Sequence, residues 1–203
     1  MPTHDDYDQG VDIAALTDAP NAETLAKSLA NAIVQRSAMR FTSASHRNAV
    51  LTAPAFGMLA ALASEKLLTL YDGSAWVVVA AGTSAWTTPA LASGFSHNGN
   101  SNGTVQYRVV NLFGERTVMW RGGLNLTYSG NAIANGGYIL TSALPPEARP
   151  TTLRTVSGAC SAADSTALAL KIDAETGGGV RIVGTGSGVT PPWLSFNNVM
   201  YSL

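Results

Sequence analysis

The stretch from residue 106 to residue 126, QYRVVNLFGERTVMWRGGLNL, decides the class of fold. It holds two runs rich in β-branched and aromatic side chains, 106–112 and 118–126, on either side of Gly114. Runs of this kind, bounded by glycine-containing turns, are typical of β-strands. Further such runs, separated by Asn-Gly, Gly-Gly and Pro, lie at 138–142, 152–156, 167–172, 180–183 and 193–201.

No helical pattern of any length follows Trp86. Short strands at close spacing, with turn residues between them, predict two packed antiparallel sheets. We therefore expect a mainly β chain whose residues 84–203 form a jelly-roll-like β-sandwich.

Residues 41–83 predict a small β-meander. Runs at 57–63, 67–71 and 76–79 read as strands, and Asp-Gly at 72–73 supplies the turn before the last of them. A short helical turn after Ser43 or Ser45 precedes the strands. A meander of this size is too small to be stable alone, so it reads as a connector.

The N-terminal residues 1–40 predict an acidic arm followed by a helix. The arm could dock on a partner or be a frayed terminus. In the helix, expected from Asn21 to about Arg40, Leu25, Leu29 and Ile33 form one apolar stripe. A helix of about five turns is marginal alone in water, so the stripe must pack on the chain or on its own copies. We expect oligomerisation here, as a short bundle around a symmetry axis.

Charge is scarce in this chain: only 12% of its residues are Asp, Glu, Lys or Arg, against about 25% in an average soluble domain. The net charge of −1 excludes a polybasic nucleic-acid binder. Between Asp72 and Arg108 no charged residue occurs, so this span must lie in the core, in a subunit interface or in polar loops, and it is one reason to expect an oligomer. The acidic first ten residues predict no signal peptide, and no apolar run is long enough to cross a membrane.

The residues offer no assembled catalytic or metal site. The glycine-rich run at 184–188 is followed by prolines and not by a helix, which argues against phosphate binding. The lone Cys160 is expected to be a small buried residue. Asp173 and Glu175 could pair as in glycosidases, but a turn at a strand end explains them more economically. We therefore expect no enzyme, no cofactor and no metal, with a glycan depolymerase as a minor alternative.

Several short motifs together resemble a known class of phage protein. They are RFTSASHR (40–47), PAFGM (54–58), LYDGSAW (70–76), WTTPAL (86–91), GF (94–95), QYR (106–108), VMWRG (118–122), LPPEARP (144–150), VRI (180–182) and WLSF (193–196). The chain resembles the minor tail and tail-fibre proteins of phages that infect Gram-positive, especially actinobacterial, hosts. The resemblance implies a leading segment that attaches to the virion, a C-terminal β-sandwich that binds the host surface, and a homotrimer. With 203 residues the chain lacks a long shaft, so a compact spike is implied.

The expected function is that of a virion structural protein at the tail end, made in the host cytoplasm. Its partners would be its own copies, other phage tail or capsid proteins through the N-terminal arm, and a host cell-surface glycan or wall polymer. A head fibre or decoration protein without a receptor remains an alternative, and a secreted lectin is weakened by the missing leader. Neither nucleic acid nor a membrane is expected as a partner.

A glycan site would need aromatic faces and amide or guanidinium donors. The candidates are the 97–102 loop and the Trp-Arg pair on the second strand run. Both alternatives stay open for the pair, because a tryptophan in a small β-domain is usually a core residue and Arg121 can stack on it structurally. The candidate ligand-binding residues are His97, Asn98, Asn100, Asn102, Trp120 and Arg121.

Overall fold

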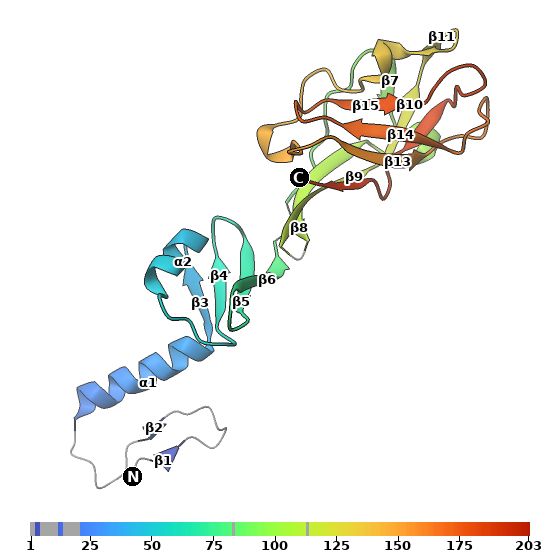
Figure 1. Cartoon of the computed structure of the whole chain (residues 1–203). Coiled ribbons are helices and arrows are strands. Elements are labelled where there is room, and N and C mark those ends of the chain that lie inside the picture. The colour runs from blue at the N-terminus through green and yellow to red at the C-terminus, as the bar shows by residue number, and fades with distance from the viewer. Residues whose placement is uncertain (1–2, 5–11, 14–20, 83, 113) are drawn as a thin grey trace. The chain divides into compact units, whose positions relative to one another are not determined.

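The computed structural model describes residues 3–4, 12–13, 21–82, 84–112 and 114–203. The chain divides into two compact units, Met1–Ala81 and Gly82–Leu203 (Figure 1). In the first unit, β1 (Thr3–His4) pairs with β2 (Asp12–Ile13). The rest of the expected acidic arm lies outside the described residues.

The first helix, α1 (Ala22–Arg36), begins where the sequence predicts it and ends earlier. Asn21 caps its start through a side-chain oxygen that accepts a backbone N–H of the first turn. The expected end, about four residues later, is wrong because the chain becomes extended at Ser37. The next residues form β3 (Ala38–Phe41), whose backbone pairs with a neighbouring strand and whose Met39 is buried.

The first unit contains a four-stranded sheet in the order β3-β4-β5-β6. β3 runs parallel to β4 (Leu59–Leu62), and the other neighbours are antiparallel. The predicted meander is confirmed by β4, β5 (Leu67–Tyr71) and β6 (Trp76–Ala81). The predicted short helix is α2 (Ala44–Val50), whose first turn is capped by the Ser43 hydroxyl.

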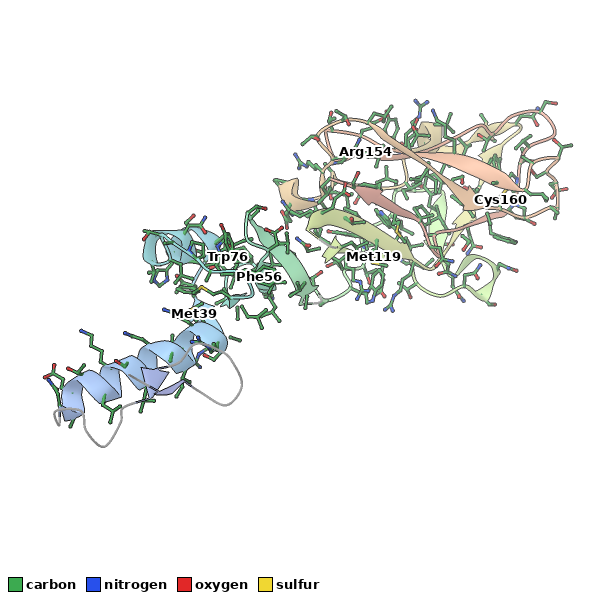
Figure 2. The ribbon with its side chains drawn as sticks, turned by 60° about the horizontal axis from the view of Figure 1, so that its bottom comes forward. Met39, Phe56, Trp76, Met119, Arg154 and Cys160 are labelled. Atoms are coloured by element: carbon green, nitrogen blue, oxygen red, sulfur yellow. The ribbon has the colours of Figure 1, made fainter. Side chains whose placement is uncertain are left out.

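The buried interior of this first unit is small. The polar part of it centres on Arg47, which donates to the Thr69 hydroxyl (3.0 Å) and places its guanidinium carbon 4.3 Å from the Trp76 ring centroid. Figure 2 labels Trp76 and Met39 in this unit. The buried hydrophobic side chains are Met39, Met58, Ala60 and Leu62.

The second unit contains three antiparallel three-stranded sheets, ordered β17-β9-β8, β16-β10-β7 and β13-β14-β15, and the small hairpin β11-β12 (Figure 1). Two of the sheets join strands far apart in the sequence, so they form only when the unit folds as a whole. The strands are β7 (Phe95–His97), β8 (Gln106–Leu112), β9 (Glu115–Arg121), β10 (Gly123–Leu126), β11 (Tyr128–Ser129), β12 (Ala132–Ile133), β13 (Arg154–Ala159), β14 (Ala169–Ala174), β15 (Val180–Val183), β16 (Trp193–Ser195) and β17 (Met200–Ser202). Short 3-10 turns are η1 (Gly99–Ser101), η2 (Ala134–Gly137) and η3 (Pro146–Ala148).

The structure corrects three of the predicted strands. The run at 118–126 is split at Gly122, whose positive φ of 99° turns the chain from β9 into β10. The run at 193–201 is likewise two strands, β16 and β17. Residues 138–142 form no continuous strand; Tyr138 and Leu140 make only isolated bridges.

One hydrophobic core lies between the sheets of the second unit. Cys160 belongs to it, as the sequence predicts. The chain is mainly β and the second unit is sandwich-like, which confirms the predicted fold class. In the described part of the chain no helix is long and apolar enough to span a membrane. The most deeply buried core side chains include Val105, Val118, Trp120, Leu124, Ile139, Ile172, Ile182, Leu194 and Phe196.

Candidate functional site

The outer face of the β17-β9-β8 sheet carries the most distinctive group of polar side chains. Because side chains alternate along a strand, Tyr107 and Trp120 point into the core while their neighbours point outward. The register pairs Gln106 with Arg121 and Arg108 with Met119 on this outer face. Figure 2 labels Met119 on β9.

The segment around Thr87 lies beside β8 and widens this face. Thr87 and Tyr107 exchange two backbone hydrogen bonds of 2.8 and 2.9 Å in an antiparallel bridge. Antiparallel pairing therefore sets Trp86 opposite Arg108 and Thr88 opposite Gln106. The face thus holds two rows, Thr88-Gln106-Arg121 and Trp86-Arg108-Met119.

Two guanidinium groups lie over the half-buried Trp86 ring. The guanidinium carbon of Arg108 is 4.5 Å from the ring centroid and that of Arg121 is 4.3 Å. Arg121 also donates through Nε and Nη2 to Gln106 Oε1 at 2.9 and 2.6 Å. Gln106 in turn donates to the Thr88 hydroxyl (2.9 Å). These contacts fix the guanidinium planes, so the cluster presents preformed donors to the surface.

A shallow hollow of about 380 Å³ lies beside this cluster. Its polar groups are only partly used: Asn197 Oδ1 accepts the Gly122 N–H (2.9 Å), and Asn102 Nδ2 donates to the Gly99 carbonyl (3.1 Å). The remaining amide oxygen of Asn102, the amide nitrogen of Asn197 and the Thr104 hydroxyl have no partner in the described part of the chain. The hollow is lined by Asn102, Gly103, Thr104, Gln106, Arg121, Gly122 and Asn197.

Most of the predicted 97–102 loop residues shape the loop itself. His97 Nδ1 accepts the Val105 N–H (3.2 Å), and Asn98 Oδ1 accepts the Gly103 N–H (3.0 Å). Asn98 and Asn100 both have left-handed backbone conformations, which asparagine tolerates better than most residues. Asn100 is exposed, outside the residues that line the hollow.

Of the predicted site residues, Asn102 and Arg121 meet in the hollow, and Trp120 does not reach the surface. Only 2% of Trp120 is exposed, and its ring centroid lies 5.3 Å from both Tyr107 and Phe196. No sugar ring could stack on it there, so its proposed ligand role is corrected to a core role. The tryptophan that the two arginines of this face contact is the half-buried Trp86.

Sequence reasoning did not select Trp86, Gln106, Arg108 or Asn197 as site residues. The alternation along 106–112 places Gln106 and Arg108 on one face, which was a usable signal. The approach of Trp86 and Asn197 to that face depends on long-range pairing. No local pattern reveals such pairing.

A larger hollow of about 680 Å³ lies elsewhere on the second unit, around Thr127, Asn135 and Thr141. These side chains donate to the backbone carbonyls of Gly94, Tyr138 and Ala90, respectively. No charged residue lines it. Its donors therefore stabilise loops, and the smaller hollow is the better candidate binding site.

The two carboxylates considered for glycan cleavage have structural partners. Asp173 accepts from the Thr155 hydroxyl (2.6 Å) and lies 3.0 Å from Lys171 Nζ. Glu175 accepts from the Tyr138 hydroxyl (2.9 Å). Among the described residues, no group of three His, Cys, Asp or Glu side chains could hold a metal ion.

No family model matches the chain, and no curated protein matches it. Among solved structures, the receptor binding protein of Listeria phage PSA is similar in part. The match has 19% sequence identity and a TM-score of 0.43, and it covers 59% of this chain. It spans 66% of the neighbour, just under two thirds of that chain. A likeness at this level identifies neither a family nor a function.

Proposed function

We propose that this chain is a structural protein of a phage virion, a homotrimeric tail fibre or tail-tip spike whose second unit binds a host cell-surface glycan or wall polymer. The motif resemblance to phage minor tail proteins supports the virion role. The observation that carries the binding role is the surface hollow around Asn102, Arg121 and Asn197, where amide, hydroxyl and guanidinium groups with unused hydrogen-bonding capacity meet.

These groups suit a carbohydrate ligand. Sugar hydroxyls both donate and accept hydrogen bonds, and the hollow offers an amide oxygen on Asn102 and N–H donors on Asn197 and Arg121. A shallow surface site of this size binds weakly by itself. Three copies on one spike would make the later contacts intramolecular and raise the avidity.

The first unit supplies the surface for trimerisation and virion attachment. None of the residues of α1 is buried in the described part of the chain. Phe56, labelled in Figure 2, is 79% exposed. Exposed large hydrophobic side chains gather in this unit, which supports association through it. They are Leu25, Leu29, Ile33, Val34, Val50, Phe56, Val77 and Val79.

Gold-labelled antibody against the chain, viewed on intact virions by electron microscopy, tests the virion role. The proposal predicts label at the tail end. Label over the head would instead support a head fibre or decoration protein without a receptor. Absence of label, with antibody that recognises the purified chain, would contradict both.

A further inference from the structure

The two arginines over Trp86 form a concentration of positive charge without a matching acid. Neither Arg108 nor Arg121 has a carboxylate partner in the described part of the chain; the ion pair described there joins Lys171 and Asp173. Both guanidinium groups, which carry like charges, contact the same indole ring. Their repulsion is unfavourable until an anion offsets it.

Both guanidinium groups also keep unused donor capacity. The protein acceptor of Arg121 is the neutral side chain of Gln106, and Arg121 is exposed. Arg108 reaches only the sulfur of Met119 (3.9 Å), a weak acceptor, and its buried Nε has no hydrogen-bond partner. Buried donors are normally satisfied, so an unsatisfied one within a charged cluster calls for an explanation.

A purely structural role accounts for only part of this arrangement. Cation–π contacts hold the segment of Trp86 against β8, and one arginine would suffice for that. A second arginine adds repulsion, and the position of Arg121 in the lining of the hollow contributes nothing to the core. The guanidinium fork of Arg121, held by Gln106 and with a second positive charge on Arg108 near the same ring, is suited to the planar or tetrahedral oxygens of an anion.

We infer that Arg108, Arg121 and Trp86 form an anion-recognition subsite, so that the ligand of the neighbouring hollow is an acidic polymer and not a neutral glycan. The recognised group is an anionic oxygen cluster, either a sugar carboxylate or a phosphate ester, with adjacent hydroxyls in the hollow. Arg121 makes the exposed contact, and Arg108 adds charge behind it. This inference rests on the proposed host-surface binding.

Isothermal titration of the full chain with three probes of matched length tests the inference. The probes are an oligogalacturonate, a glycerol-phosphate oligomer and a neutral malto-oligosaccharide. We expect at least one acidic probe to bind about tenfold or more tightly than the neutral one, with affinity falling as salt rises. Whichever acidic probe binds more tightly distinguishes the carboxylate from the phosphate source.

Four variants assign the effect to this cluster. Arg121→Gln and Arg108→Gln should each weaken acidic-probe binding about tenfold, a change of about 1.4 kcal/mol. Arg121→Lys should keep part of the affinity because it keeps the charge and loses the fork. Arg40→Gln removes the same charge from an exposed position on β3 and should change nothing. Melting curves identify any variant that is merely unfolded. Because Arg121 is exposed and Arg108 is partly buried, replacing Arg121 should disturb folding less.

The outcomes separate this inference from the proposed function. If wild-type protein binds host cells but prefers the neutral probe, or if Arg121→Gln binds acidic probes normally, the inference is wrong and the proposed function stands. Failure to bind either acidic probe at millimolar concentration also overturns the inference. If the wild-type chain does not bind host cells, the proposed function fails, whatever the probes show.

Discussion

At the scale of single residues, Gly122 sets the geometry of the hollow. It ends β9 with a positive φ of 99°, and a Cβ built on it would lie 2.1 Å from the Thr104 carbonyl oxygen. Only glycine permits this close approach of the two backbones. The approach brings Thr104 beside Asn197, which accepts the Gly122 N–H.

Replacing Gly122 by alanine should therefore destabilise the second unit and deform the hollow. Gly184 is a matched control, since its φ is 98° and nothing lies within 4 Å of its built Cβ. Both variants carry backbone strain on the order of 1–3 kcal/mol. Gly122→Ala adds the clash, so its loss of unfolding free energy in urea should be the larger by at least about 1 kcal/mol. Equal losses would contradict the account.

Asp173 should make folding stability depend on acid pH. Burial alone would raise the pKa of Asp173, but the Thr155 hydrogen bond and the Lys171 charge outweigh it and hold the pKa below 3.8. A lowered pKa in the folded state stabilises the protein above the unfolded pKa, and this contribution is lost as pH falls through the folded pKa.

Urea unfolding of wild type and Asp173→Asn across a pH series checks this. The difference in unfolding free energy between wild type and Asp173→Asn should be largest at neutral pH and shrink as the pH falls below about 3.8. Thr155→Val keeps the carboxylate and removes its hydrogen bond, which brings the folded pKa nearer the unfolded one, so the stability lost on acidification should be smaller and its loss complete at a higher pH. A difference independent of pH would contradict the assignment.

At the scale of elements, α1 is the helix whose apolar side chains lack partners in the described part of the chain. Leu25, Leu29 and Ile33 recur at every fourth residue and so follow one face, while Lys27 and Asn31 lie on the opposite one. All of these side chains are exposed. Since a helix this short gains most of its stability from packing, association of three copies would stabilise it.

A charge on the apolar face should disrupt the trimer, and the same charge on the opposite face should not. Light scattering after size exclusion should give three times the chain mass of 21.0 kDa for wild type and Asn31→Glu. Leu29→Glu and Ile33→Glu should give the monomer mass because they bury a carboxylate in the bundle. A monomeric wild type at micromolar concentration would count against the homotrimer.

The bounds of the strands and of α1 show how much of the fold could be predicted from the sequence. β8 and β15 were predicted at their observed bounds because β-branched runs end at clear turn signals. The end of α1 was misplaced because pairing of β3 with β4 overrides a local helical pattern. The split of 118–126 depended on a close backbone approach at Gly122, which spacing along the chain cannot reveal.

The site was predicted in part for the same reason. Asn102 and Arg121 were predicted because polar loop residues and an arginine beside an apolar run suggest recognition; both line the hollow, and their role in binding stays a prediction. Trp120 was misassigned because periodicity alone does not say which face of a strand is buried. Trp86 joins the site because its neighbour Thr87 pairs with Tyr107 of β8, a residue 20 positions further along the chain.

At the scale of the whole molecule, the second unit holds the large core by itself. Every residue of the main hydrophobic cluster lies between Leu91 and Leu203. The first unit has few buried side chains and many exposed apolar ones. This division fits an attachment part and a binding part, and the separate roles of residues 1–40 and 41–83 stay a prediction.

Residues 82–203 produced alone should therefore fold and stay monomeric. We expect a cooperative thermal transition close to that of the second unit in the full chain, because the core is retained. Circular dichroism and light scattering measure both properties. A fragment that unfolds without cooperativity, or that forms trimers, would contradict the division of roles.

Competition for phage adsorption tests the central claim most directly. Purified full-length chain is added to host cells before the phage that carries it, and unadsorbed phage are counted. We predict that wild type reduces adsorption and that a variant with Asn102, Arg121 and Asn197 all replaced by alanine does not. A folded wild-type chain that leaves adsorption unchanged, or a triple variant that blocks it equally well, would contradict receptor binding at this hollow.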